Sequence, residues 1–278
     1  MVFYSSLFGC EIYTTGLWKD DTLIWTDSET QEIFEKKNMK IELTDIKKSF
    51  GDKVALNIDS YEVNDGEVIG LVGNNGAGKT TMFRVILDLI KPESGVALLD
   101  GINPAVSEEW KEYTGAYVDS GFLIDYLTPE EYFSLIAKIT NMTAEELENR
   151  LHSFKGFMND EVLGQNTLIR NLSMGNKQKV GIIAAMLTRP KLLILDEPFN
   201  FLDPTSQLLI KQIIEKYNQD TGATIIISSH NLTHTIDICT RVTLLEHGRI
   251  IKDYDKTTHK DIISEIENYF IENMKKDE

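Results

Sequence analysis

The sequence predicts an α/β fold built around a parallel β-sheet. Short, continuous runs of apolar residues, such as EVIGLVG, KLLILDEP and ATIIISSH, alternate along the chain with segments of helical periodicity. Strands that are apolar on both faces are typical of a parallel sheet covered by helices on both sides. The first of these runs ends in glycine and leads into a helical pattern, so the chain passes there from strand to loop to helix.

The composition limits the class of protein. The 278 residues are 42% hydrophobic and 26% charged, as in an ordinary soluble globular protein. The formal net charge is −16, and an acidic chain repels nucleic acid at long range, so we expect no nucleic-acid partner. The two cysteines, Cys10 and Cys239, lack the CxxC spacing of a zinc site. No apolar stretch is long enough for a membrane span, and the N-terminus lacks the cationic start of a secretory signal.

Three parts of the chain differ in pattern. Residues 1–38 are aromatic and acidic and show no period of 2 or 3.6. We favour an appendage there, or an over-extended start before a natural initiator at Met39; a dedicated functional domain is the alternative. The main domain is expected over 39–255, and a C-terminal amphipathic helix over 256–278. The apolar face of that helix holds Ile262, Ile263, Ile266, Phe270 and Ile271.

The main domain contains elements of both kinds. The segments MKIELTDIKKSF and KVALNIDSYEV, joined by a turn at 50–52, predict an antiparallel β element at its N-terminal end. Residues 129–170 are rich in helix formers and predict a small helical subdomain, with Thr143 as an N-cap. A hairpin is expected to turn at 247–248. The helical pattern after the glycines places on one face Val85, Ile86, Leu89 and Ile90.

The segment 73–81 has the GxxxxGK[ST] spacing of a phosphate-binding loop. Its glycines let the backbone wrap around phosphate oxygens, and the helix N-terminus favours negative charge. Lys79 is expected to reach the β- and γ-phosphates of ATP, Thr80 to bind Mg²⁺, and Thr81 to donate to the α-phosphate. Chance gives such a match in roughly one chain of this length in a hundred. The expected nucleotide-binding residues are Gly73, Asn74, Asn75, Gly76, Ala77, Gly78, Lys79, Thr80 and Thr81.

Two acids follow the apolar run LLIL. Because a lone buried carboxylate is costly, acids at the end of a buried strand call for a reason. Beside the phosphate loop, Asp196 can hold Mg²⁺ through water, and Glu197 can act as the general base that polarises the attacking water. The alternative is a solvated strand end with a turn at Pro198.

The segment 172–178, LSMGNKQ, resembles the LSGGQ signature of the ABC ATPase family, and the resemblance covers most of 39–255. Ser173 and Gly175 keep the pattern, whereas two positions depart from it, Met174 and Asn176. The variant LSxGxKQ is similar to that of exporter ATPases of the ABC-2 and bacitracin-resistance type.

Further positions match the same family. The resemblance implies that Ser173 and Gly175 meet the γ-phosphate held by a partner's phosphate loop. Asp203 resembles the D-loop aspartate that communicates across the dimer, and His230 resembles the switch histidine that contacts the γ-phosphate. Phe50 resembles the aromatic residue that stacks on adenine, with an ordinary core aromatic as the alternative.

One position departs from the family. The usual glutamine after the strand GAYV is replaced by Ser120, which follows Asp119. That glutamine normally binds Mg²⁺, so the resemblance implies weakened or altered metal coordination with Ser120 as a ligand. The apolar segment 122–127 lies next in the chain. In the family this region receives a coupling helix of the membrane subunit; core packing is the alternative.

The resemblance implies an α/β P-loop NTPase core with a parallel sheet, an N-terminal antiparallel β element and a helical ABC subdomain. It further implies an ATP-hydrolysing subunit of a bacterial exporter, cytoplasmic and peripheral on the inner membrane face. The expected partners are ATP with Mg²⁺, a second ABC ATPase in a homodimer or heterodimer, and a separate transmembrane permease. The alternatives are a soluble ABC ATPase of translation, DNA or cluster assembly, and a weakly hydrolysing regulatory protein.

Overall fold

The chain divides into two units, Met1–Lys37 and Asn38–Glu278. In the first unit β1 pairs with β2 and β3 with β4, all antiparallel. Whether residues 1–38 are an appendage, an over-extended start or a functional domain stays a prediction, since most of them lie outside the described residues. The four short strands are β1 (Ser6–Leu7), β2 (Cys10–Glu11), β3 (Thr15–Lys19) and β4 (Thr22–Thr26). The computed structural model describes residues 6, 7, 10, 11, 15–19, 22–26, 39–259 and 261–274.

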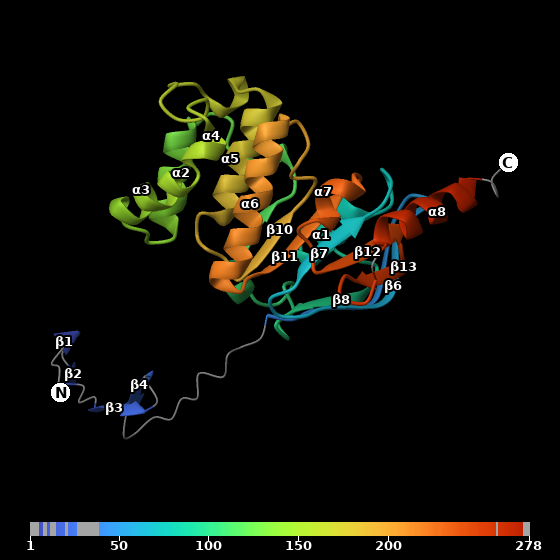
Figure 1. The fold of residues 1–278 in the computed structure, drawn as a ribbon, viewed down its shortest axis with the longest axis horizontal. Helices are drawn as coiled ribbons and strands as arrows, with labels where there is room; N and C mark the ends of the chain where they lie inside the picture. The colour runs from blue at the N-terminus through green and yellow to red at the C-terminus, as the bar shows by residue number, and fades with distance from the viewer. Residues whose placement is uncertain are drawn as a thin grey trace. The chain divides into compact units, whose positions relative to one another are not determined.

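The second unit is built on a six-stranded sheet with the order β13-β12-β7-β11-β10-β9 (Figure 1). The strands from β12 to β9 run parallel, and β13 is antiparallel to β12. The predicted α/β fold with a parallel sheet is confirmed. The strands are β7 (Val68–Val72), β9 (Thr114–Tyr117), β10 (Leu192–Leu195), β11 (Thr224–Ser229), β12 (Arg241–Glu246) and β13 (Arg249–Asp255).

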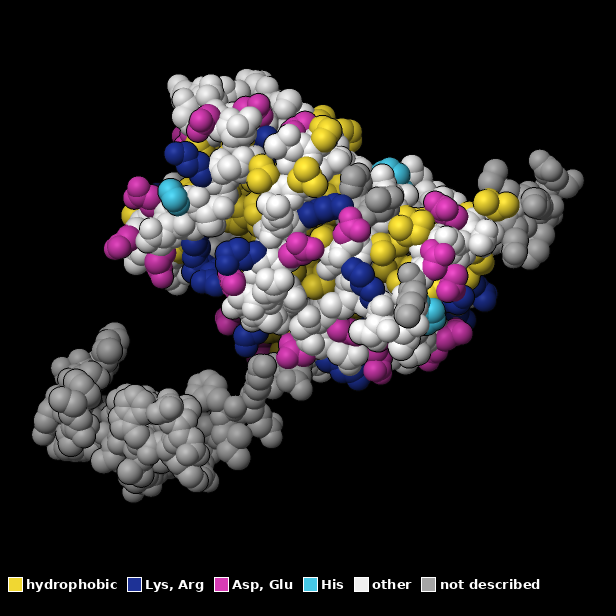
Figure 2. Space-filling view, in the orientation of Figure 1, with side chains coloured by type: hydrophobic (Ala, Val, Ile, Leu, Met, Phe, Trp, Pro, Cys, Tyr) yellow, Lys and Arg dark blue, Asp and Glu magenta, His cyan; other side chains and the backbone are white. Residues whose placement is uncertain are grey.

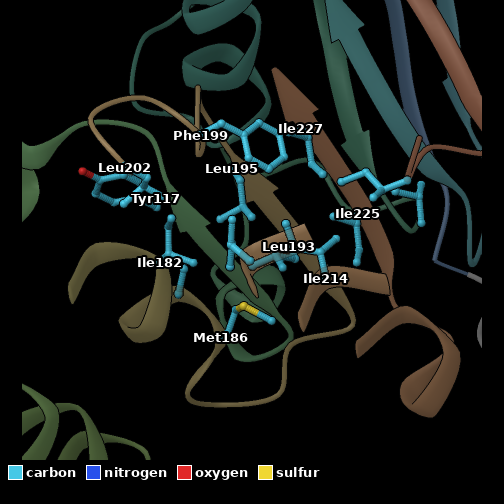
Figure 3. Close-up of a cluster of buried hydrophobic side chains, with 14 of the residues drawn as sticks. Tyr117, Ile182, Met186, Leu193, Leu195, Phe199, Leu202, Ile214, Ile225 and Ile227 are labelled. Carbon is cyan, nitrogen blue, oxygen red and sulfur yellow. The ribbon is translucent and has the colours of Figure 1, made fainter. Parts of the chain in front are cut away.

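The central strands are apolar on both faces because each face has its own core. In β10, Leu193 and Leu195 pack in one cluster with residues of α5 and α6, as Figure 3 shows. Leu192 and Ile194 point to the other face and pack with Phe83 of α1. The covering helices are α1 (Lys79–Ile86), α5 (Met174–Met186), α6 (Pro204–Thr221) and α7 (Leu232–Ile236).

A second, antiparallel sheet has the order β6-β5-β8, which confirms the predicted N-terminal β element. Its strands are β5 (Ile41–Phe50), β6 (Lys53–Val63) and β8 (Ser94–Leu99). The turn between β5 and β6 uses Gly51 at a φ of 59°. Strand β8 was not predicted from the sequence; its last four residues, VALL, are apolar, and only Ala97 and Leu99 are buried.

The predicted helical subdomain is present beside α5 (Figure 1). Its elements are α2 (Pro129–Ile139), α3 (Ala144–Ser153), α4 (Lys155–Met158) and the short 3₁₀ helix η3 (Ile169–Asn171). Thr143 is confirmed as an N-cap: its hydroxyl accepts from Glu146 N at 3.2 Å, and Glu146 Oε2 accepts from Thr143 N at 2.8 Å. Two more 3₁₀ helices flank β9, η1 (Glu109–Glu112) and η2 (Ser120–Phe122).

Two helix predictions need correction. Leu89 lies outside α1 and is 46% exposed, because the helix ends at Ile86 and the chain turns at Asp88 with a φ of 50°. Ile266 of α8 (Ile262–Met274) is buried as expected, but Ile271 is 51% exposed. The end of α8 projects from the body of the domain (Figure 1), whereas Tyr269 and Phe270 still pack against the core.

Charge is spread over the surface of the domain. Acidic and basic side chains are interspersed over the face drawn in Figure 2. None of the described helices combines the length and the hydropathy that a bilayer span requires.

Gly115 marks a tight contact between β9 and α5. A Cβ there would lie 2.0 Å from Ala185 O and 2.8 Å from Pro190 Cγ. We expect Gly115→Ala to lower the free energy of unfolding by about 1–3 kcal/mol, because overpacking forces backbone to shift. Gly156 in α4 is the matched control, since a Cβ there meets nothing within 4 Å. Urea denaturation measures both, and equal stabilities of the two variants would contradict the prediction.

Candidate functional site

The predicted phosphate loop connects the carboxyl end of β7 to the N-terminus of α1. Ligands of open α/β sheets bind at this edge. The pocket there has a volume of about 270 Å³. The structure thereby brings the loop together with Phe50 from β5 and Glu197 from the end of β10. Its lining residues are Phe50, Lys53, Ala55, Asn75, Gly76, Ala77, Gly78, Lys79, Thr80, Thr81 and Glu197.

The loop is held in shape by its neighbours. Gly78 has a φ of 114°, and a Cβ there would lie 2.5 Å from Ala55 O, so only glycine fits. Gly248, in the turn between β12 and β13, donates its N–H to Ala77 O at 2.8 Å. Elements far apart in the sequence therefore fix the course of the loop.

Lys79 is a buried cation, 6% exposed. Its Nζ donates to Gly73 O at 2.7 Å and to Asn74 O at 3.4 Å. The same atom lies 3.3 Å from Glu197 Oε1. A buried charge needs partners. In the described part of the chain these three oxygens stabilise the Lys79 ammonium group.

Thr80 and Asp196 lie side by side at the end of the sheet. Thr80 Oγ1 donates to Asp196 Oδ2 at 2.5 Å, and the Ser228 hydroxyl donates to Asp196 Oδ1. Burial raises the pKa of the Asp196 carboxyl, and the two hydroxyl hydrogen bonds oppose that rise. A buried carboxylate beside a hydroxyl offers the hard oxygen ligands that Mg²⁺ prefers, so these residues fit that metal.

Hydrogen bonds to its backbone fix the position of Glu197, and its carboxylate contacts Lys79 and His230. Its φ of 47° lies in the left-handed region, which is uncommon for any residue with a side chain. Its N–H donates to Ser228 Oγ at 2.8 Å, and its carbonyl accepts from Gln178 Nε2 at 3.0 Å. Its Oε2 lies 2.8 Å from His230 Nδ1. The carboxylate therefore sits between Lys79 and His230, beside the phosphate loop.

Phe50 is 54% exposed, with Lys48 Nζ 5.4 Å from the ring centroid. It is not an ordinary core aromatic. Its ring lies at the pocket edge, where a flat base can stack on it.

Several predicted residues do not line this pocket: Gly73, Asn74, Asp196 and His230 lie next to lining residues, and the signature and D-loop residues lie on other elements. Ser173 is the N-cap of α5, and its hydroxyl accepts from Asn176 N at 3.2 Å. Asp203 is the N-cap of α6 and accepts from the N–H groups of Thr205 and Ser206, both at 3.0 Å. Gly175 opens α5 beside Ser173. Ser173 and Asp203 are both exposed.

Ser120 also lies outside the pocket lining, at the start of η2. Its neighbour Asp119 accepts from Gly121 N at 2.7 Å and lies 3.6 Å from Arg84 Nη2. An ion pair with Arg84 therefore connects Asp119 to α1. The role of Ser120 as a metal ligand stays a prediction.

Four residues of the site were not predicted; one of them is Ala55, an ordinary apolar residue of β6 that lines the pocket. Lys53 lines the pocket; its only sequence signal is its place three residues after Phe50. Ser228 binds Asp196 and Glu197, and its signal is a hydroxyl at the end of a buried strand. Gln178 binds the Glu197 carbonyl from within the signature segment.

Comparisons with known proteins agree with this geometry. A family model described as ABC transporter matches residues 56–200. An uncharacterized ABC transporter ATP-binding protein of Bacillus subtilis, YdbJ, is 34% identical over 78% of this chain and 71% of its own length. The bacitracin transport ATP-binding protein BcrA of Bacillus licheniformis is 31% identical over 77% of this chain and 69% of its own. The dimeric structure of MJ0796, a bacterial ABC transporter cassette, has a TM-score of 0.69 at 25% identity and covers 77% of this chain and 98% of that one.

These findings confirm the resemblance that the signature segment carried, and the fold that it implied. Such cassettes form dimers, bind and hydrolyse ATP, and work with transmembrane subunits. The chain therefore belongs to the ABC transporter family, as an ATP-binding and ATP-hydrolysing subunit.

Proposed function

We propose that two cassettes, two copies of this chain or one copy with a related ATPase, close on two ATP molecules and share both sites. One observation carries this proposal: Ser173, Gly175 and Asp203 lie outside the pocket that holds the loop. The donors of Ser173 and Gly175 at the start of α5 suit a phosphate. They therefore complete the site of a second cassette, whose loop binds the rest of the nucleotide.

Within one site we assign roles from the contacts. Phe50 stacks on the base, Lys79 binds the β- and γ-phosphates, and Glu197 is the general base. In the described state Glu197 Oε1 is the carboxylate partner of Lys79. Phosphate oxygens can replace that carboxylate, which frees Glu197 to accept a proton from the attacking water. His230, 2.8 Å from Glu197 Oε2, holds the base in position.

We also propose that the site uses Mg²⁺, held by Thr80 and Asp196. The metal supplies positive charge that neutralises the phosphate oxygens. The two residues fit because their oxygens are adjacent and Asp196 is only 7% exposed.

Ser120→Gln tests the altered metal site. If the serine weakens coordination, glutamine is expected to lower the Mg²⁺ concentration for half-maximal turnover about tenfold, the effect of one supporting ligand. Ser120→Ala is the matched control and is expected to raise that concentration or leave it unchanged. Unchanged Mg²⁺ dependence and turnover in Ser120→Gln would remove Ser120 from the metal site.

We infer that the chain drives a separate permease, on the cytoplasmic face of the membrane and in the direction of export. The segment 122–127 supports a docking surface, since Phe122 is 57% and Tyr126 74% exposed. A cavity of about 540 Å³ adjoins it. Two of its lining residues, Trp110 and Thr114, have a buried Nε1 and Oγ1 without hydrogen-bond partners in the described part of the chain. Both atoms are themselves closed off from solvent, so neither forms a polar contact for an occupant of the cavity. The likeness to a Nod factor export ATP-binding protein of Sinorhizobium fredii, 31% identical over 78% of this chain and 63% of its own length, supports export.

Ser173→Asp tests the shared site. A negative charge there repels the phosphates of the nucleotide on the other cassette, so we expect loss of turnover and of ATP-dependent dimers, with ATP binding to the loop unchanged. Sedimentation with ATP and a steady-state assay measure these effects. Ser153→Asp is the matched control, because the Ser153 hydroxyl bonds to Arg150 O within its own helix. Full turnover by Ser173→Asp, at a specific activity independent of protein concentration, would overturn the shared site.

Co-purification with native membranes tests the permease. Recovery with a multi-span membrane protein is the expected result. Stable association with ribosomes or DNA would contradict it.

A further inference from the structure

Gln178 is a buried amide that connects two elements of the domain; it is 5% exposed. Its Nε2 donates to the Glu197 carbonyl at 3.0 Å, and its Oε1 accepts from the Tyr117 hydroxyl at 2.9 Å. The Glu197 carbonyl can only accept, so the amide nitrogen must face it, which leaves the amide oxygen for the hydroxyl. The two hydrogen bonds therefore form one directed chain from Tyr117 to Glu197.

Tyr117 is firmly held at the other end of this chain. It is 6% exposed, and its backbone carbonyl accepts from Asp196 N at 2.8 Å. Its ring lies against Gly181 of α5, where a Cβ would meet ring carbon Cε2 at 2.1 Å. Burial raises the pKa of the Tyr117 hydroxyl, so it remains a donor at neutral pH. The ring cannot approach α5 further without moving that helix.

Tyr117 also forms part of the wall of the 540 Å³ cavity, together with Phe122 and Leu123. The same side chain thus borders the cavity beside the segment 122–127 and begins the hydrogen-bond chain to Glu197.

We propose that Tyr117 is a positioning residue, which acts through Gln178 to hold Glu197 in its catalytic geometry. The inference rests on the proposed role of Glu197 as general base. Glu197 keeps a left-handed backbone, with its N–H bound by Ser228 and its carbonyl by Gln178. When the Gln178 amide is displaced, the peptide can relax and the carboxylate turns away from Lys79 and His230. Occupation of the cavity by a protein segment that shifts the Tyr117 ring therefore changes the position of the base.

Tyr117→Phe removes only the hydroxyl and tests the proposal. We expect kcat for ATP hydrolysis to fall about fivefold to tenfold, the effect of one lost hydrogen bond, with KM for ATP unchanged. Gln178→Met breaks the same chain and should cause at least this loss. The double variant should be no slower than Gln178→Met, because both changes interrupt one path.

Tyr217→Phe is the matched control. Tyr217 is half-buried against the same core, and its hydroxyl donates to Pro190 O at 2.7 Å. It should lower thermal stability by a similar amount and leave kcat unchanged. A wild-type kcat in Tyr117→Phe, or additive losses in the double variant, would overturn the proposal. Glu197→Gln, assayed in parallel, separates the base role of Glu197 from the positioning role of Tyr117. If Glu197→Gln keeps full turnover, Glu197 is not the base. If turnover is lost in Glu197→Gln but not in Tyr117→Phe, only the positioning role of Tyr117 is wrong.

Discussion

Glu197→Gln is expected to lower ATP turnover by about 10²–10⁴-fold, the contribution of a general base. The amide cannot accept the proton of the attacking water, yet it has nearly the same shape. Because Glu197 opposes the phosphates with its own negative charge, the variant should bind ATP at least as well as the original chain. ATP-bound dimers should therefore accumulate, which gel filtration with ATP would show.

The control for this variant is Glu108→Gln, which changes an acid that is 86% exposed in its side chain and does not line the pocket. Turnover in Glu108→Gln should match that of the original chain. If Glu197→Gln kept more than a tenth of the original kcat, another group would have to be the base. His230, which contacts Glu197, would be the next residue to replace.

Lys79→Ala is expected to lower the affinity for ATP by about 10²–10⁴-fold. Removing one member of a buried charged pair costs about 3–5 kcal/mol, and each factor of ten in affinity is about 1.4 kcal/mol. Lys79 is suited to such an effect because it is almost fully buried and bound by Gly73 O and Glu197. Titration with a slowly hydrolysed ATP analogue measures the loss.

Lys216→Ala is the control for charge, since Lys216 is 75% exposed in its side chain and pairs with Asp220 in its own helix. Its affinity for ATP should be unchanged. Circular dichroism should show that both variants are folded. A change of less than threefold in Lys79→Ala would mean that the loop does not hold the phosphates.

The parts of the fold with a strong local pattern were predictable. The strands around Leu193 and Ile226 are apolar on both faces, and the cap at Thr143 has its glutamate three residues later. The order of the strands was not predictable, because β7 pairs with β11 through residues as distant in the sequence as Ile69 and Ile226. Strand β8 was not predicted either, because its run VALL shows no alternation of apolar and polar residues.

The same distinction applies to the site. Sequence motifs predicted Lys79, Thr80 and Glu197, because each of these residues stands at a fixed place in a short local pattern. Ser228 and Gln178 act through hydrogen bonds to residues 19 or more positions away. No local pattern marks such partners, since a buried serine or glutamine occurs for many reasons.

The support of the phosphate loop by the turn at Gly248 has a consequence for the reaction cycle. Ala77 O is already bound by Gly248 N, and Lys79 by Gly73 O. A loop that is formed in advance loses little conformational entropy when nucleotide enters. It offers the same backbone donors to the diphosphate part of ADP as of ATP, so it retains the product nearly as well as the substrate. Release of ADP must then begin at the groups that contact the third phosphate of ATP and at the second cassette. The loop keeps its shape while the two cassettes separate.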